Sequence, residues 1–201
     1  MTGYKNIILE NKYTAVILEG GKSSRMGTVK ALLPINNKPA VENIINILIS
    51  HFEELLISAN QNQQNIFEYL EKSVIKDEVD NQGPLGGIYS ALKQSSSEKN
   101  FIIACDIPVI NIELIKKMLK LSADQDYDIV IPCNNGKYEP LYAVYSKQII
   151  PVIKELLNAN SRKIICLLPL CKTKVINISM DSWYKNLNTK YDYEKFLQEA
   201  G

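Results

Sequence analysis

The chain has 201 residues, a formal net charge of +1 at pH 7 and 46% hydrophobic residues. This length suits a single domain with its own core, and the near-zero charge argues against a nucleic-acid partner, because nucleic-acid-binding proteins usually carry a large basic excess. No apolar stretch approaches the ~20 residues that span a bilayer, and the N-terminal apolar run Ile7–Leu9 is too short for a signal-peptide core. We therefore expect a cytoplasmic protein without a membrane partner.

Strand-like apolar runs alternate with segments of helical periodicity along most of the chain. The expected strands are Thr14–Leu18, Glu54–Ala59, Ser73–Lys76, Phe101–Cys105, Asp128–Pro132, Glu139–Tyr145 and Lys174–Ile178. The expected helices are Pro39–His51, Asn62–Glu71, Pro84–Gln94, Ile112–Leu121, Ile149–Leu157 and Lys163–Leu168. Repeated βα units predict a single-domain, three-layer α/β/α fold with a mostly parallel sheet and helices on both faces. We assign residues 14–201 to this domain and residues 1–13 to an N-terminal extension.

Four cysteines occur without a CxxC pair or a histidine-rich partner segment, which argues against a zinc site and favours reduced, structural thiols. They are Cys105, Cys133, Cys166 and Cys171.

Several polar segments directly follow expected strands. They are residues 19–30, Asn60, residues 77–87 and Asp106. Because ligands bind beyond the carboxyl ends of the strands in sheets of this kind, we expect these segments to converge on one crevice.

The first of these segments, LEGGKSSRMGTVK at residues 18–30, combines three glycines with three cations. Glycines let backbone N–H groups approach anionic oxygens, and Arg25 and Lys30 would add positive charge, so the loop is suited to phosphate. Its GKS fragment has the wrong spacing for a Walker A loop, because that motif needs a glycine at position 16, where Val16 stands. The alternative is a glycine-rich turn whose cations are solvated.

Asp106 ends an apolar strand in the run ACDIP, where a carboxylate could hold a hard cation such as Mg²⁺ together with phosphate oxygens and waters. The alternative is an aspartate that caps a helix or turn. Residues 77–87 form a second glycine-rich loop after a strand. Its Asp77 could accept hydrogen bonds from ribose hydroxyls or a base edge, or it could belong to a polar turn.

The opening loop resembles the signature L-A-G-G-x-S-x-R-M-G-x-x-K of the molybdenum cofactor guanylyltransferases, which are nucleotidyltransferases with a Rossmann-like half. The resemblance continues in the family's order through GPLGGIYSAL, ACDIP, NGKYEPLYAVY, NSRKIICLL and KNLNT, so it covers residues 14–195. The chain departs from the family at Glu19, where alanine is usual, in a short spacing from Arg25 to Lys30, and in the extension of residues 1–13.

The resemblance implies transfer of GMP from GTP to the terminal phosphate of molybdopterin, with Mg²⁺ as cofactor and release of pyrophosphate. The residues that it assigns to GTP are Leu18, Glu19, Gly20, Gly21, Lys30, Asn60, Asp77 and Asp106. The catalytic group comprises Arg25, Lys30 and Asp106, and Asp106 also holds the metal. The molybdopterin side comprises Glu139, Arg162, Lys163, Asn186 and Asn188, with Lys137 nearby. Transient contact with other proteins of the molybdenum cofactor pathway also follows.

Alternatives to these assignments remain. The cations of the molybdopterin side could be solvated surface charges, and Asn186 and Asn188 could form the turn before the last helix, although Asn188 could instead reach the metal. The whole chain could be a cytidylyltransferase for the same pterin, or a catalytically silent nucleotide-binding relative. Gly20 and Gly21 favour guanine, since they leave room for a purine.

Glu19 raises a separate question, because a carboxylate ~4 Å from a phosphate would be repelled by several kcal/mol at an effective dielectric near 20. We therefore expect its side chain to point away from the phosphates. It would pair with Lys22 or Arg25, which we favour, or accept hydrogen bonds from guanine.

Overall fold

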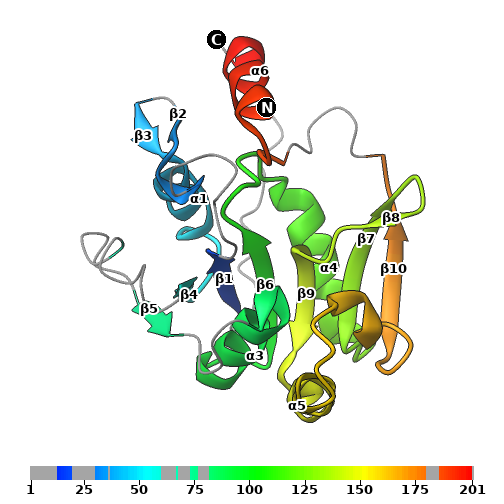
Figure 1. Ribbon diagram of the computed structural model, residues 1–201. Helices are drawn as coiled ribbons and strands as arrows, with labels where there is room; N and C mark the ends of the chain where they lie inside the picture. The colour runs from blue at the N-terminus through cyan, green and yellow to red at the C-terminus, as the bar shows by residue number, and fades with distance from the viewer. Residues whose placement is uncertain are drawn as a thin grey trace.

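The computed structural model describes residues 13–19, 30–35, 37–59, 67, 73–76, 82–179 and 186–200. Their main feature is an eight-stranded mixed sheet in the order β5-β4-β1-β6-β9-β7-β10, with β8 beside β7 (Figure 1). Its strands are β1 (Thr14–Leu18), β4 (Glu54–Ala59), β5 (Ser73–Lys76), β6 (Lys99–Ala104), β7 (Ile129–Asn134), β8 (Lys137–Tyr138), β9 (Tyr142–Ser146) and β10 (Thr173–Asn177). A separate two-stranded sheet consists of β2 (Pro34–Ile35) and β3 (Lys38–Pro39).

Most of the strand pairs are parallel, as the repeated βα units predict. Central β1 is parallel to β4 and to β6, so that Val16 lies opposite Leu56 on one side and Ile102 on the other. The exceptions are β9, which lies between β6 and β7 and is antiparallel to both, and β8, which is antiparallel to β7. The predicted mostly parallel sheet is confirmed, and β9 separates its two parallel parts.

Helices cover both faces of the sheet. The apolar sides of α1 (Ala40–Leu48) and α4 (Ile112–Asp124) join one core cluster, and those of α3 (Gly83–Gln94) and α5 (Ile150–Asn158) join the other. Figure 1 shows α3 and α5 on the near side of the sheet and α4 behind it. The three-layer α/β/α prediction is confirmed.

The two cores follow from strand alternation along β1. Ala15 and Ile17 face the α1–α4 side, whereas Val16 and Leu18 face the α3–α5 side, and all four are 5% exposed or less. Successive side chains of a strand point to opposite faces, and a strand covered on both faces reads as a continuous apolar run. Burying the larger three of these side chains, Val16, Ile17 and Leu18, contributes about 1.5–3 kcal/mol each.

Several predicted elements differ from those observed. The predicted strand Glu139–Tyr145 begins only at Tyr142, because the Glu139 carbonyl accepts a 3.1 Å hydrogen bond from the Tyr142 amide and closes a turn. The predicted helix Lys163–Leu168 is a 3₁₀ segment, η4 (Ile164–Leu167). Of the predicted helix at residues 62–71, only Phe67 is described, and it is helical and buried.

Two further segments are 3₁₀ turns, η1 (Lys30–Leu32) and η3 (Lys147–Ile149). The last helix, α6 (Lys190–Ala200), lies beyond the upper edge of the sheet in Figure 1. Residues 1–12 lie outside the described residues, so the N-terminal extension stays a prediction, although Tyr13 is 4% exposed and packs in the core. Within the described ranges, no helix combines the length and the apolarity needed to cross a bilayer.

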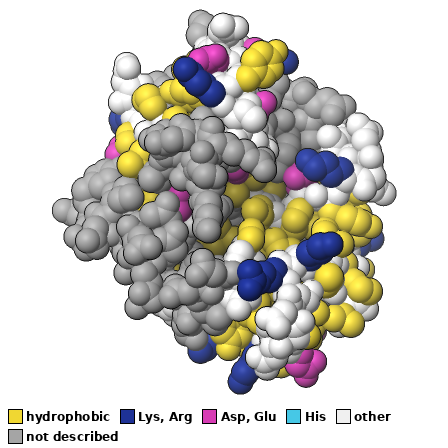
Figure 2. Space-filling view, viewed as in Figure 1, with side chains coloured by type: hydrophobic (Ala, Val, Ile, Leu, Met, Phe, Trp, Pro, Cys, Tyr) yellow, Lys and Arg dark blue, Asp and Glu magenta, His cyan; other side chains and the backbone are white. Residues whose placement is uncertain are grey.

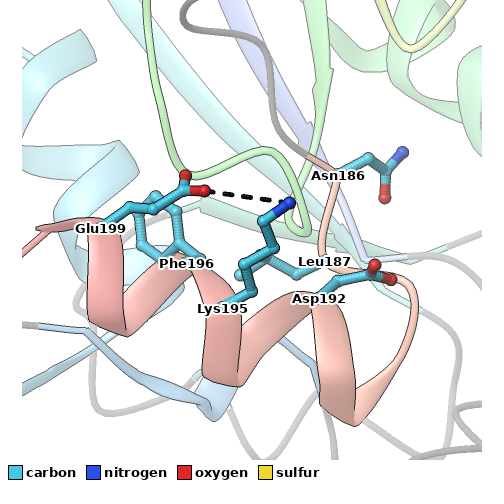
Figure 3. Close-up of a pocket in the computed structure, with 6 residues that line it drawn as sticks. All are labelled: Asn186, Leu187, Asp192, Lys195, Phe196 and Glu199. Carbon is cyan, nitrogen blue, oxygen red and sulfur yellow. Dashed lines mark ion pairs between the residues drawn. The ribbon is translucent and has the colours of Figure 1, made fainter.

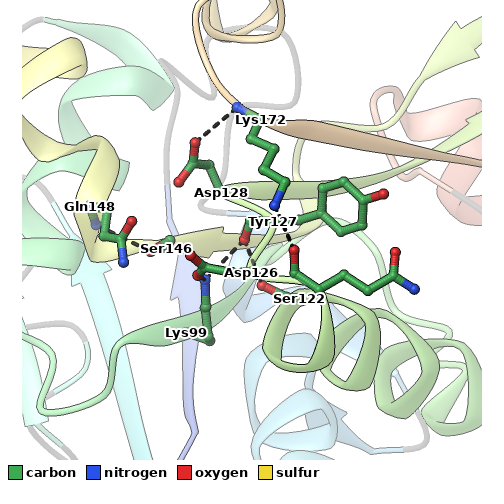
Figure 4. A network of polar contacts seen from close by, with 9 residues as sticks. Lys99, Ser122, Asp126, Tyr127, Asp128, Ser146, Gln148 and Lys172 are labelled. Carbon is green, nitrogen blue, oxygen red and sulfur yellow. Dashed lines mark hydrogen bonds and ion pairs between the residues drawn. The ribbon is translucent and has the colours of Figure 1, made fainter.

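A polar network fastens the lower edge of the sheet, at the starts of β6, β7 and β10 (Figure 4). The Lys99 ammonium donates to the Tyr127 carbonyl at 3.0 Å. Asp128 accepts a 2.8 Å hydrogen bond from the Lys172 amide through its carboxylate, and another of 2.8 Å from the Ser146 amide through its carbonyl. This edge is therefore closed by structural contacts, which leaves the opposite, carboxyl edge for a ligand.

Candidate active site

The carboxyl ends of β1, β4 and β6 meet at one edge of the sheet. The Glu19 amide donates a 2.9 Å hydrogen bond to the Ser58 carbonyl of β4, and the Cys105 amide donates a 3.1 Å hydrogen bond to the Leu18 carbonyl. Parallel register makes this proximity unavoidable, since Leu18 lies opposite both Ser58 and Ala104. The end of β1 is therefore hydrogen-bonded to the ends of both β4 and β6, and the chain leaves all three strands at the same place.

Asp106 lies in the turn that ends β6. The Ile107 amide donates to the Ala104 carbonyl at 3.2 Å, which closes the turn. The Oδ1 atom of the Asp106 carboxylate is buried. The Asp106 carbonyl accepts a 2.8 Å hydrogen bond from the Leu187 amide, so the segment that begins at Asn186 lies against this turn although 80 residues separate them.

The segment before β9 reaches the same edge because β9 is antiparallel to β6. The Ala104 amide donates a 3.0 Å hydrogen bond to the Leu141 carbonyl. Glu139 is 7% exposed, and its Oε1 lies 3.1 Å from the ammonium of exposed Lys137. The turn at residues 139–141 thus carries the buried Glu139 carboxylate to the edge where β6 ends, and exposed Lys137 of β8 pairs with it.

Glu19 is 4% exposed. A carboxylate as buried as this is stable only when a cation or hydrogen-bond donors compensate it, so Glu19 does not belong to the solvated rim of the loop. The cations that we expect beside it, Lys22 and Arg25, lie outside the described residues, and the predicted pairing stays a prediction.

The other expected site residues divide into two groups. Gly20, Gly21, Arg25, Asn60 and Asp77 lie outside the described residues. Lys30 opens η1, directly before the β2–β3 hairpin. Arg162 and Lys163 are exposed in the segment between α5 and η4, and the hydrogen bonds that assemble the described part of the Asp106 edge do not include them. Figure 2 shows hydrophobic side chains gathered over the β7–β10 half of this face, with Lys and Arg side chains among them.

Asn186 and Asn188 form the turn before the last helix that the sequence allows, and their role on the molybdopterin side stays a prediction. The Asn188 amide donates to the Asn186 carbonyl at 3.0 Å, which is a tight turn, and Leu187 between them holds the turn against Asp106. Asn188 is exposed, whereas Asn186 is partly buried. The segment therefore begins the last helix and also borders the candidate site.

The donor chemistry of this edge fits a hard divalent cation. Asp106 offers carboxylate oxygens, which are the donors that Mg²⁺ prefers. Among the described residues there is no group of three or more His, Cys, Asp and Glu side chains that could hold a metal alone. A cation here would thus share Asp106 with phosphate oxygens and water, which is the usual arrangement for Mg²⁺.

Sequence reasoning missed the part that α6 plays at this edge. Its Tyr193 hydroxyl donates to the Pro34 carbonyl of β2, and its Phe196 packs against Leu187 in a small cluster. A capping signal was available, because Thr189 and Asp192 have T-x-x-D spacing and Asp192 accepts 2.8 Å hydrogen bonds from the Thr189 amide and hydroxyl. That signal predicts the start of the helix but not where the helix docks.

Comparison with known proteins adds sequence relatives to this geometry. The family model described as the MobA-like NTP transferase domain matches residues 15–169. A "Probable molybdenum cofactor guanylyltransferase" of Carboxydothermus hydrogenoformans is 38% identical over 192 residues, which cover 92% of this chain and 95% of the relative. A "Molybdenum cofactor guanylyltransferase" of Vibrio vulnificus is 34% identical over 186 residues, covering 91% and 94%.

Solved structures share the fold. A "Molybdopterin-guanine dinucleotide biosynthesis protein A" from Archaeoglobus fulgidus superposes with a TM-score of 0.82 at 21% identity, covering 93% of this chain and 98% of that one. A Mycobacterium tuberculosis protein, solved in complex with manganese, superposes with a TM-score of 0.69 at 12% identity, covering 93% and 98%. At these identities the likeness concerns the fold.

Proposed function

The chain belongs to the MobA-like NTP transferase family, and from that premise we propose that it is a molybdenum cofactor guanylyltransferase. It is a nucleotidyltransferase that moves GMP from GTP to the terminal phosphate of molybdopterin and releases pyrophosphate. The observation that carries the proposal is the Leu187–Asp106 hydrogen bond of 2.8 Å, because it joins the candidate nucleotide edge to the candidate acceptor segment at the carboxylate suited to a metal. The two curated relatives described above, from Carboxydothermus hydrogenoformans and Vibrio vulnificus, match 92% and 91% of the chain.

The chemistry asks the protein for positioning and charge neutralisation. An acceptor phosphate oxygen attacks the α-phosphorus of GTP and the bond to pyrophosphate breaks, so negative charge builds on the transferred and leaving groups. The backbone from Leu18 to Gly21 holds the nucleotide, and Arg25 and Lys30 neutralise its phosphates. Asp77 helps to fix the ribose or the base, and Asn60 also contributes to GTP binding.

Asp106 is the metal ligand in this proposal. Mg²⁺, when bound, supplies positive charge to the phosphate oxygens. Asp106 orients it at the junction between donor and acceptor, and the buried position of Oδ1 supports a fixed carboxylate. A carboxylate held in place does not have to reorganise as the reaction charge develops.

The acceptor side comprises Glu139, Arg162, Lys163, Asn186 and Asn188. The 3.1 Å ion pair between Glu139 and Lys137 supports this assignment, because it places a cation beside the Glu139 carboxylate at the edge where β6 ends. We also propose a cytoplasmic location and transient contact with the pathway proteins that supply molybdopterin and receive the product.

Nucleotide binding tests the proposal most directly. The chain is titrated with GTP, CTP and ATP, each with and without Mg²⁺, and its melting temperature is recorded. A ligand at a free concentration of 100 times its Kd stabilises the folded protein by about 2.7 kcal/mol. Because the nucleotide that binds most tightly stabilises most, GTP with Mg²⁺ should give the largest increase in melting temperature. A larger shift with CTP would favour the cytidylyltransferase. GTP binding without GMP transfer to molybdopterin would favour a catalytically silent relative.

A further inference from the structure

Helix α6 links two segments that carry expected site residues. Its Tyr193 hydroxyl donates a hydrogen bond to the Pro34 carbonyl, four residues after Lys30. The chain that leads into α6 donates from the Leu187 amide to the Asp106 carbonyl at 2.8 Å. The helix therefore connects the segment of an expected phosphate-binding cation to the expected metal carboxylate.

A small apolar cluster joins the same two segments through side chains. It consists of Ile35, Ala40 and Leu187, with Tyr193 and Phe196 of α6 packed against it. Leu187 is 2% exposed and Ile35 is 4% exposed, although neither belongs to the two main cores. Movement of α6 would therefore uncover apolar side chains in both segments at once.

The backbone between η1 and α1 is held in a way that can transmit this contact to Lys30. The Leu33 carbonyl accepts a 2.9 Å hydrogen bond from the Ala40 amide. The Asn43 side-chain amide donates to the Ile35 carbonyl at 2.9 Å. Because both α1 and α6 hold the β2–β3 hairpin, we expect a change in the docking of α6 to shift the backbone at Lys30.

Helix α6 itself is weakly packed. No described side chain of α6 is buried, and a pocket of about 140 Å³ remains between it and the segment that leads into it (Figure 3). Figure 3 shows Lys195 and Glu199 turned toward each other at this pocket, and their ion pair is long at 4.0 Å. Elements with few buried apolar contacts open more easily than the core does. The contacts of α6 therefore matter less for the stability of the whole chain than for the segments they join.

We propose that Tyr193 is a positioning residue of the transfer reaction, which acts through Pro34 to hold the Lys30 segment at a fixed distance from Asp106. The inference rests on the proposed function, which places Lys30 at the phosphates of GTP and Asp106 at the metal. Phosphoryl transfer depends on the placement of such charges, and a displacement of about 1 Å can reduce its rate by about 10². Tyr193 contacts no reacting atom and acts only through the hairpin.

The test compares Tyr193→Phe with Tyr191→Phe. Each variant removes one hydroxyl from α6, but Tyr191 is 71% exposed and does not belong to the cluster. Tyr193→Phe keeps the ring, so its melting temperature should fall by no more than about 4 °C. With saturating GTP, Mg²⁺ and molybdopterin, its kcat should fall about tenfold and its KM for GTP should change less than about twofold, because alignment rather than nucleotide binding is lost. Tyr191→Phe should keep the wild-type kcat.

Hydrogen exchange of the full-length chain without substrates gives a second readout that needs no catalysis. Peptides that cover residues 30–35 should exchange about fivefold faster in Tyr193→Phe than in the wild type, as the loss of one hydrogen bond predicts. The same peptides should exchange at the wild-type rate in Tyr191→Phe.

A wild-type kcat in Tyr193→Phe would overturn the proposal even if exchange were faster, because the contact would then be only structural. An equal loss of kcat in Tyr191→Phe, or unchanged exchange of residues 30–35 in Tyr193→Phe, would also overturn it. A wild-type chain that transfers no GMP would contradict the proposed function, and faster exchange in Tyr193→Phe would still support the link between α6 and the Lys30 segment.

Discussion

The Tyr145 hydroxyl donates a 2.7 Å hydrogen bond to the carbonyl of Pro140. It joins β9 to the turn that carries Glu139 toward the Asp106 edge. Tyr145 is fully buried, and this burial raises the pKa of its phenol well above the ordinary value, so the group remains a donor at every working pH. A buried tyrosine thereby fixes the shape of the predicted acceptor turn.

Removing this hydroxyl in Tyr145→Phe should cost about 1 kcal/mol of unfolding free energy, or about 2–4 °C in melting temperature. It should also raise KM for molybdopterin while KM for GTP stays unchanged. Ser122→Ala is the control, because its hydroxyl donates a similar 3.0 Å hydrogen bond to the Tyr127 carbonyl at the opposite edge. An equal effect of both variants on KM would make the Tyr145 contact merely structural.

Asp106→Asn keeps the shape of the side chain but removes its charge. If Asp106 holds the metal, GMP transfer should fall by about 10²–10³, as when one preorganised electrostatic group is removed, and the variant should remain folded. Initial rates with saturating GTP, together with the melting temperature, measure both effects. Near-normal transfer by the folded variant would rule out the metal assignment.

Glu19→Ala separates a structural role from base reading. Because Glu19 is 4% exposed, we expect the variant to lose stability, while GTP affinity changes by less than about tenfold, or ~1.4 kcal/mol. Selectivity for GTP over CTP should persist, because a carboxylate paired within the loop does not contact the base. Competition binding with the two nucleotides measures this. Loss of the GTP preference would identify Glu19 as a base reader.

The β7–β8 hairpin turns through Asn135 (φ 49°) and Gly136 (φ 80°). A Cβ at Gly136 would meet nothing within 4 Å, so any effect of substitution comes from the backbone conformation. Gly136→Ala should destabilise the protein by about 1–2 kcal/mol, and Gly136→Asn by less, because asparagine tolerates the left-handed region. Thermal melts of both variants give the order, and equal losses would contradict this explanation.

The reactivity of the Cys171 thiol should depend on pH in a way that reports its burial. Burial, and secondarily the nearby Asp128 carboxylate, raise the pKa of its thiol to about 11. Alkylation at pH 8 should therefore be slower than for an ordinary thiol with a pKa near 8.5, by about two orders of magnitude. Peptide mapping of the native and the urea-unfolded chain compares the two rates. The folded chain binds the Cys171 thiol proton more tightly than the unfolded chain does. The free energy of unfolding should therefore decrease as the pH rises from about 8.5 to 11.

The sequence predicted best where one physical rule decides the outcome. The strands Thr14–Leu18 and Glu54–Ala59 have their predicted bounds, because both are mostly apolar segments whose side chains are almost all buried between two layers. The direction of β9 was not predictable in this way, because periodicity indicates a strand but not the neighbour it joins. The β7–β8 hairpin was missed although Asn135-Gly136 is a strong hairpin signal.

The same division applies to the candidate site. Local patterns predicted that Glu19 and Asp106 lie at the same edge of the sheet, since each follows an apolar strand and parallel strands end at one edge, and the structure places both there. The contacts of Asp106 with Leu187 and of Ala104 with Leu141 join segments distant in the sequence. No local pattern encodes such contacts, so the docking of α6 and its pocket appeared only in the structure.

The antiparallel position of β9 has a consequence for the order in which the chain folds during synthesis. The strands β5, β4, β1 and β6 can pair as soon as Ala104 has left the ribosome, because no later strand lies between them. In contrast, β7 emerges early but has no place on this sheet until β9, ending at Ser146, has been made and fills the gap next to β6. Domains tend to fold from the N-terminus as they emerge, and pairing between distant segments is slow. We therefore expect the β5-β4-β1-β6 part, proposed to bind the nucleotide, to form first and to serve as the template for β9, β7 and β10. Until β9 has been made, the unpaired edge of β6 is exposed to mispairing.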